Sequence, residues 1–450
     1  MKLSKWLTDE ISLPYLKTII WLLIAITFYF FFLALALNKI FEPIHEDEAQ
    51  WIWVSQRNFT LLLERDFANE SWSEGYSTFG CNNPKIAQYL IGISLYAGGE
   101  LNTTNRNWAK PNIWNHERGN IPNFRTLFWG RLLMPFLGAG CIILFLFIIA
   151  RGVSLIPCML ATLFFCLNPF FYPMIILFSA RAMQDIPALF LFLFSITLLI
   201  SFNLRETLEK SFMKSILCIS LLGICFGLSI STKLNNLALL GIWLAYLSWI
   251  IMVDFSPQFR IKIGGILKLI FFGFLSLVVA FAIFILSNPY LYEKSISVLF
   301  KKIKIIFDLH YIVANYRFIY PKSALWSIKD KIITLHNINV LMFGDLWSTP
   351  KGFFSQWFVY IFELLLVIGV FSIFYRLYEK FKTEQIFKLD CLMLITLTVI
   401  IVIIANLSWI PLSWDRLFIP FLAPIAIVVG FTIESIIGIS STAVQRIIGR

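Results

Sequence analysis

The stretch YFFFLALALNKIFEPIHEDEAQWIWVSQ, residues 29–56, joins a long apolar run to the densest acidic cluster of the chain. The run, residues 18–37, contains no charged side chain. About 18 or more apolar residues in succession predict a helix that crosses a membrane. Three acids in a row, Glu46, Asp47 and Glu48, follow where this helix would leave the bilayer. The junction therefore predicts a membrane protein with polar chemistry at the bilayer surface.

The rest of the chain is also apolar. Of its 450 residues, 59% are hydrophobic and 14% are charged. A water-soluble domain could not bury so much apolar surface, because single cores stop growing near about 300 residues. Hydropathy predicts an all-α bundle of about ten spans, near residues 18–38, 132–150, 153–178, 186–203, 214–231, 236–253, 265–288, 354–375, 389–409 and 417–435. Asn168, Pro169 and Pro173 interrupt the third span, and such residues can break it into two short pieces.

Lysine and arginine in short loops predict the orientation, because they stay on the cytoplasmic side. Sixteen lie on one side of the predicted spans: Lys2, Lys5, Lys17, Arg151, Arg205, Lys210, Lys214, Arg260, Lys262, Lys268, Arg376, Lys380, Lys382, Lys388, Arg446 and Arg450. We therefore expect both termini in the cytoplasm. The same loops account for the net charge of +11 without a nucleic-acid partner.

Two long segments then lie outside, residues 39–131 and 289–352, within one membrane domain of residues 1–450. In the second, residues 298–312 alternate apolar and basic side chains at helical spacing, which predicts a helix along the membrane surface. A composition rich in Phe, Ile, Lys and Asn favours a bacterial plasma membrane.

Four cations on the outer side run against the orientation rule: Arg131, Arg181, Lys233 and Arg416. A single cation of this kind is commonly a side chain that snorkels to the interface. Four on one face predict that an anionic group is bound there. A phosphate on a long hydrocarbon tail fits, because Lys and Arg bind its oxygens while the tail stays in the bilayer.

The acidic cluster and these cations suffice to transfer a sugar from a lipid phosphate. The acceptor is a weak nucleophile and gains from losing a proton to Asp47 or Glu48, which the residues alone do not distinguish. The leaving phosphate is already an anion and needs only fixed positive charge. We expect no cofactor. A metal is not favoured, because His45 and the acids beside it would point apart on a helix.

HEDEAQWIWVSQ (45–56) resembles the Asp-Glu motif in the first external loop of the lipid-phosphate-dependent GT-C glycosyltransferases. This superfamily includes the protein O-mannosyltransferases and the aminoarabinose transferase that modifies lipid A. Five further segments resemble the family in the same order: CNNPKIAQYLIG (81–92), FRTLFWGRLLMPFLGA (124–139), SARAMQDIPALFLF (179–192), TKLNNLALL (232–240) and WDRLFIPFLAP (414–424). The resemblance implies a GT-C-like bundle and a polyprenyl-phosphate-linked sugar as donor.

The resemblance also implies roles for single residues. Asp47 would be the catalytic carboxylate with Glu48 in support. The lipid phosphate would be held by Lys233 and Arg416, with Arg131 and Arg181. Asp185 and Lys85 are expected to support the site or contact the acceptor, and the spacing of Asp185 from Arg181 is that of a helical ion pair.

The sequence also departs from the family. Asn83-Pro84-Lys85 replaces the His-Pro-Pro of the mannosyltransferases, and Leu417 replaces the usual Tyr after Arg416. The acceptor therefore stays open among a glycolipid, a glycan and a protein.

A transporter or flippase of lipids or lipid-linked sugars is the alternative class. It would place charged residues near the middle of the spans. Here the mid-span positions are nearly all apolar and the charges gather at one face. A polysaccharide ligase or polymerase is a closer rival, but it would carry its main catalytic loop late in the chain. The acids directly after the first span favour the transferase.

Overall fold

The computed structural model of the chain is built from helices. It describes residues 14–45, 47–72, 85–102, 121–167, 176–202, 204, 212–254, 263–293, 295–313, 321–346, 353–382, 386–410 and 419–448. In these ranges the regular elements are α-helices and short 3-10 helices, and no β-strand occurs. The all-α prediction is confirmed.

The first half of the chain combines long apolar helices with the helices of the first long segment. In chain order these are α2 (Pro14–Asn38), α3 (Glu48–Leu63), η1 (Glu70–Trp72), α4 (Ile86–Ala97), α6 (Phe124–Ile149), α7 (Leu155–Leu167), α9 (Asp185–Ser201) and α11 (Phe212–Ile230). α6 begins at Asn123, whose side chain accepts a hydrogen bond from the Thr126 N–H at 2.8 Å and so caps the helix.

The second half begins at a short turn that carries Lys233. Its elements are η2 (Leu234–Leu237), α12 (Ala238–Asp254), α13 (Ile263–Leu286), η3 (Pro289–Leu291), α14 (Ile296–Val313), η4 (Pro321–Ser323), α16 (Ile328–Leu346), α17 (Phe353–Lys382), α18 (Ile386–Trp409) and α19 (Leu422–Ile448). The stretch predicted as a surface helix thus folds as α14.

Eight stretches of helix in the described ranges are long and apolar enough to cross a membrane. They lie in α2, α6, α11, η2 with α12, α13, α17, α18 and α19. α7 and α9, with 13 and 17 residues, correspond to the other two predicted spans. The three interrupting residues of the third predicted span lie outside the described residues.

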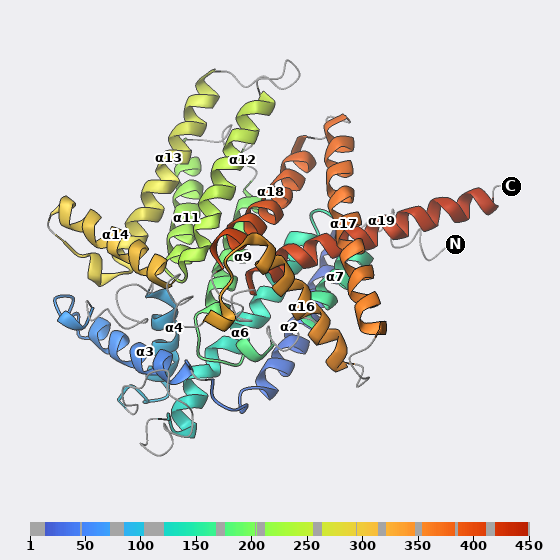
Figure 1. Cartoon of the computed structure of the whole chain (residues 1–450). Helices are drawn as coiled ribbons and strands as arrows, with labels where there is room; N and C mark the ends of the chain where they lie inside the picture. The colour runs from blue at the N-terminus through green and yellow to red at the C-terminus, as the bar shows by residue number, and fades with distance from the viewer. Residues whose placement is uncertain are drawn as a thin grey trace.

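Glycines let α11 and α13 pack closely. A Cβ atom on Gly223 would lie 2.7 Å from the carbonyl oxygen of Ser276, and one on Gly227 would lie 2.6 Å from that of Ala280. The sequence GICFG, residues 223–227, is therefore a Gly-xxx-Gly contact of the kind that joins membrane helices. Figure 1 shows α11, α12 and α13 side by side, with α3 and α14 across their lower ends.

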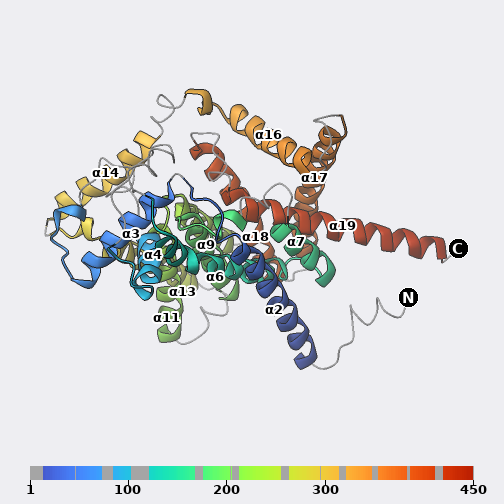
Figure 2. The same ribbon diagram turned by 90° about the horizontal axis from the view of Figure 1, so that it is seen from below.

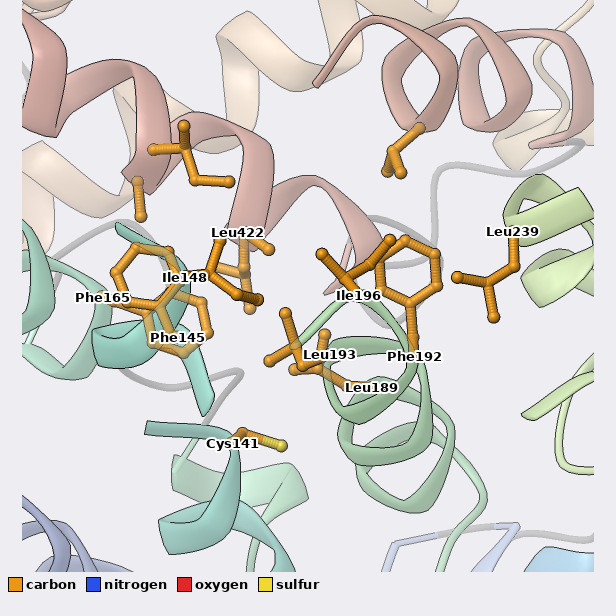
Figure 3. Packing of buried hydrophobic residues seen from close by; sticks show 14 of the residues in the cluster. Cys141, Phe145, Ile148, Phe165, Leu189, Phe192, Leu193, Ile196, Leu239 and Leu422 are labelled. Carbon is orange, nitrogen blue, oxygen red and sulfur yellow. The ribbon is translucent and has the colours of Figure 1, made fainter. Parts of the chain in front are cut away.

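The apolar core surrounds α9. This helix packs against α6, α11 and α12. Figure 3 shows its inner side chains among those of α6, α7, α12 and α19; the labelled residues are Cys141, Phe145, Ile148, Phe165, Leu189, Phe192, Leu193, Ile196, Leu239 and Leu422. α19 continues beyond this core and extends past the neighbouring helices (Figure 2). Because α9 is central, the residues at its start lie where several helix ends meet.

Candidate functional site

Helix ends from four parts of the chain meet near the start of α9. The Ala182 N–H, just before α9, donates to Glu48 at the start of α3 at 2.8 Å. Asp185 pairs with Lys233, which stands between α11 and η2. The Ile86 N–H, at the start of α4, donates to the Ser231 carbonyl oxygen at 3.0 Å. These contacts bring most of the predicted site residues to one end of the bundle.

Glu48 and Arg131 form an ion pair with no exposed side-chain surface. Arg131 Nε and Nη2 donate to the two carboxylate oxygens of Glu48, each at 2.6 Å. Arg131 also donates to the carbonyl oxygens of Ile40, Glu42 and Pro43 at 2.6, 2.8 and 3.5 Å. A guanidinium has five N–H groups, and here five acceptors receive them.

The Glu48 carboxylate is equally engaged. Besides its two bonds from Arg131, it accepts the Ala182 N–H and the His45 N–H, the latter at 3.2 Å. It therefore joins α3, α6, the segment after α2 and the turn before α9. Four donors in the protein therefore surround the Glu48 carboxylate, which leaves its oxygens little room to contact a substrate.

Asp47 stands at the N-cap position of α3, and its side chain is half-buried. An acid at this place usually caps the helix through its carboxylate. Here the carboxylate makes no capping hydrogen bond, and the Asp47 N–H donates to His45 Nδ1 at 3.2 Å. Capping therefore does not explain the acid.

Asp185 and Lys233 form a second buried ion pair. Lys233 Nζ donates to Asp185 Oδ1 at 2.6 Å, and the side chains are 3% and 10% exposed for Asp185 and Lys233. The expected helical pair of Asp185 with Arg181 is wrong. α9 begins only at Asp185, so Arg181 lies in the turn before it and the two residues share no helix.

This second pair lines an open pocket, whose empty space counted out into its mouth is about 470 Å³. The polar lining is Asp185, Lys233, Asn235, Asn236 and Asn406, and the remaining lining is Ala188, Leu189, Phe192, Ala238, Val402, Ile419, Pro420 and Ala423. Asn236 Nδ2 donates to the Ala188 carbonyl oxygen at 3.0 Å and to Ser229 Oγ at 2.9 Å, which fixes the turn after Lys233 against α9. The pocket is thus mostly apolar with one charged corner.

Arg181 lies beside the first ion pair. Its guanidinium carbon is 5.3 Å from the centre of the Phe178 ring. Burial lowers the pKa of Arg181, and the nearby Glu48 carboxylate opposes that shift. Its Nε is buried and, within the described part of the chain, has no hydrogen-bond partner. Arg181 therefore keeps a donor that Arg131 does not.

Fewer contacts are known for two other predicted site residues, Lys85 and Arg416. Lys85 is buried just before α4, and the bond from its neighbour Ile86 to Ser231 sets it beside the turn of Lys233. Arg416 lies outside the described residues, as do Glu46, Asn83, Pro84 and Leu417. The pocket is lined by Ile419, three residues after Arg416.

Sequence reasoning missed the amides of this region. Gln50 is 1% exposed, and neither its oxygen nor its nitrogen has a hydrogen-bond partner in the described ranges. It stands three residues after Asp47 and so lies on the same face of α3. That spacing is the one signal that could have pointed to it. Asn406 lies near the end of the apolar helix α18. In the sequence, the one signal for it is that a polar residue interrupts a predicted span.

A search of curated protein sequences gives no match. The family model described as "Dolichyl-phosphate-mannose-protein mannosyltransferase" matches residues 66–291. Several solved structures are similar to the chain, among them the following three. The archaeal oligosaccharyltransferase AglB from Archaeoglobus fulgidus, in complex with an inhibitory peptide and a dolichol-phosphate, has a TM-score of 0.51 and 12% identity. The similarity covers 95% of this chain and 52% of that one.

The same organism's oligosaccharyltransferase in complex with Zn and sulfate also has a TM-score of 0.51 and 12% identity, over 91% of this chain and 49% of that one. The O-mannosyltransferase Pmt1-Pmt2 complex of S. cerevisiae, bound to the sugar donor, has a TM-score of 0.43 and 15% identity. That similarity covers 64% of this chain and 34% of the other. The chain thus spans about half the length of the oligosaccharyltransferases and a third of the mannosyltransferase. At these identities, the likeness to the oligosaccharyltransferases shows the fold alone.

The family model matches half of the chain, including α4, α6, α9 and the turn of Lys233. The helical bundle has the fold of the GT-C oligosaccharyltransferases. The chain therefore belongs to the dolichyl-phosphate-mannose-protein mannosyltransferase family, within the GT-C superfamily of membrane glycosyltransferases.

Proposed function

We propose that the protein transfers a sugar from a polyprenyl-phosphate-linked donor to an acceptor at the extracytoplasmic face of the membrane. The observation that supports this most is the pocket at Lys233, where a buried cation stands at one corner of an apolar cavity. A polyprenyl phosphate has the same two parts, a charged head and an apolar tail. The donor would lie with its phosphate at Lys233 and the start of its tail between α9, α18 and α19.

The phosphate would be held by Lys233 and by Arg416, which precedes the pocket-lining residues Ile419 and Pro420. Lys85, beside the same turn, and the spare donor of Arg181 would add positive charge around it. Fixed cations stabilise the negative charge that develops on the leaving phosphate. We assign no direct phosphate contact to Arg131, because five acceptors in the protein receive its N–H groups.

Asp47 would act as the general base. It removes the proton of the acceptor hydroxyl while the acceptor oxygen bonds to the sugar C1 and the bond from C1 to the phosphate oxygen breaks. The bonding electrons leave with the polyprenyl phosphate. Glu48 and Arg131 would position Asp47, because their pair fixes the first turn of α3 against α6.

In this scheme the segments 39–131 and 289–352 face the exterior, both termini lie in the cytoplasm, and the membrane is the bacterial plasma membrane. The acceptor is a glycolipid, a glycan or a protein. No cofactor or metal takes part, so EDTA should leave the transfer rate unchanged.

The test uses purified protein and a panel of polyprenyl-phosphate sugars, with membrane extract as the source of acceptor. We expect wild type to release free polyprenyl phosphate from one of these donors. Asp47→Asn should lower the rate by about 100- to 10,000-fold, the usual contribution of a general base. Glu64→Gln is the matched control, because Glu64 is an exposed acid at the other end of α3.

The outcomes separate the two functions. If wild type releases nothing from any donor, the proposed transferase activity is wrong. Translocation of a labelled lipid-linked sugar across the membrane of vesicles would then test the alternative function, that of a flippase. If Asp47→Asn stays fully active, the donor class stands and the base is another group.

A further inference from the structure

Lys233, the cation at the charged corner of the pocket, does not stand alone. Asp185 lines the same pocket, and its carboxylate is 2.6 Å from the ammonium. Asn236 and Ala188, each three residues further along, make a second contact between the same two segments. Lys233 and Asp185 are therefore held in register, and the two side chains form a pair of opposite charges.

A pocket that only had to hold a phosphate would not need an acid at this place. A buried carboxylate costs desolvation energy, and its repulsion weakens the binding of any anion nearby. Asp185 is the first residue of α9 and is ion-paired with Lys233. Its carboxylate therefore lies beside any phosphate that reaches Lys233.

The phosphate changes its charge during the proposed reaction. In the donor it is a diester with one negative charge. When the bond between the sugar and the phosphate oxygen breaks, the electron pair stays on that oxygen, and the product is a monoester. A phosphate monoester carries between one and a half and two negative charges at neutral pH, because its second pKa is about 6. The repulsion from a fixed carboxylate therefore acts more strongly on the product than on the donor.

We propose that Asp185 weakens the binding of the polyprenyl phosphate product relative to the donor, and that it thereby speeds product release. This role rests on the proposed function, since it needs a lipid phosphate at Lys233. It predicts that removing the charge of Asp185 strengthens product binding. A purely structural role, in which Asp185 only positions Lys233, predicts the opposite sign.

The first measurement uses Asp185→Asn in the purified full-length protein and compares the Kd for polyprenyl phosphate with the KM for the donor. We expect the variant to bind the product about tenfold more tightly, a change that one like charge a few ångströms away readily supplies, and the donor affinity to rise less. The steady-state kcat should fall because release becomes slower. The single-turnover rate should not fall.

The control is Asp390→Asn. Asp390 is also a buried aspartate near the start of a helix, and it accepts a hydrogen bond from Trp249 Nε1 at 3.1 Å. It does not line the pocket, so this variant should keep the wild-type ratio of product Kd to donor KM. Weaker or unchanged product binding in Asp185→Asn would overturn the proposal.

A second measurement needs no variant. Wild-type protein is titrated with polyprenyl phosphate and with its methyl diester, which has one negative charge and no reactive sugar. We expect the diester to bind at least as tightly as the monoester, whereas an unpaired cation would prefer the monoester. If wild type binds neither lipid and transfers no sugar, the proposed function fails and this role with it. If wild type transfers sugar but prefers the monoester, only the role of Asp185 fails.

Discussion

The two buried ion pairs of the site differ in what surrounds them. Arg131 directs five N–H groups to Glu48 and to three carbonyl oxygens, and no side-chain surface of this pair is exposed. Lys233 makes one short bond to Asp185 at the edge of the open pocket. The first pair connects segments of the chain to one another, whereas the second faces a space that a ligand could fill.

The difference shows that charge and burial do not by themselves identify a binding residue. Arg131 and Lys233 are both buried cations on the same side of the predicted membrane. What separates them is whether the protein already satisfies their donors. A saturated guanidinium stabilises the fold, and a cation beside an open pocket is available for an anionic substrate. Substitutions of single residues in either pair test this difference between a structural cation and a binding cation.

The largest effect should come from Arg131→Met. This change leaves the Glu48 carboxylate buried without its counter-charge, which costs about 3–5 kcal/mol of unfolding free energy. Chemical denaturation of the protein in detergent measures the loss. Arg125→Met on the same helix is the control, because the Arg125 side chain is 70% exposed and its pair with Glu100 should contribute less than about 1 kcal/mol.

The double variant Glu48→Leu, Arg131→Met tests the reason for that loss. Replacing both charges with apolar groups should recover much of the stability, because no charge is then left unpaired. Equal losses in Arg131→Met and Arg125→Met would show that the pair does not anchor α3.

A smaller effect, and one on binding, should come from Lys233. In the Asp185→Asn background, Lys233→Gln removes the cation without leaving an unpaired acid. We expect the Kd for polyprenyl phosphate to rise about 10- to 100-fold relative to Asp185→Asn alone, because hydrogen bonds to charged groups contribute about 1.5–3 kcal/mol. Equilibrium binding of the labelled lipid measures it.

The matched lysine is Lys302 on α14, which pairs with Glu293 and lies outside the pocket lining. Lys302→Gln should leave the Kd unchanged. Similar losses for both lysines would mean that general positive charge, and not the corner of the pocket, attracts the lipid.

The smallest effect should come from Gln50, whose buried amide has no partner in the described ranges. Gln50→Leu removes two unpaired polar atoms and should stabilise the protein by about 1–2 kcal/mol. Thermal unfolding would show a higher Tm. Gln56→Leu on the same helix should lower it, because Gln56 Nε2 donates to the Glu100 carbonyl oxygen at 2.5 Å. If both variants instead had a lower Tm than wild type, the prediction for Gln50 would be wrong, and its side chain would have a structural role.

Several features of the molecule could be predicted from local sequence. Apolar runs predicted the helices, because the bilayer requires about 20 apolar residues with every backbone group bonded inside the helix. The same argument predicted an interrupted third span, whose interrupting residues lie outside the described ranges. The acid cluster could be placed at the end of the first helix, which is where α3 begins.

The sequence by itself thus determined an all-α membrane bundle and the residue types at the end that carries the site, because hydropathy and charge act over neighbouring residues. Local spacing paired Asp185 with Arg181, and it did not show which side chains contact Glu48. Only the tertiary structure showed these contacts, since Glu48 meets Arg131 across 83 positions and Asp185 meets Lys233 across 48. Such pairs depend on how helices pack, and helix packing follows from shapes that are far apart in the chain.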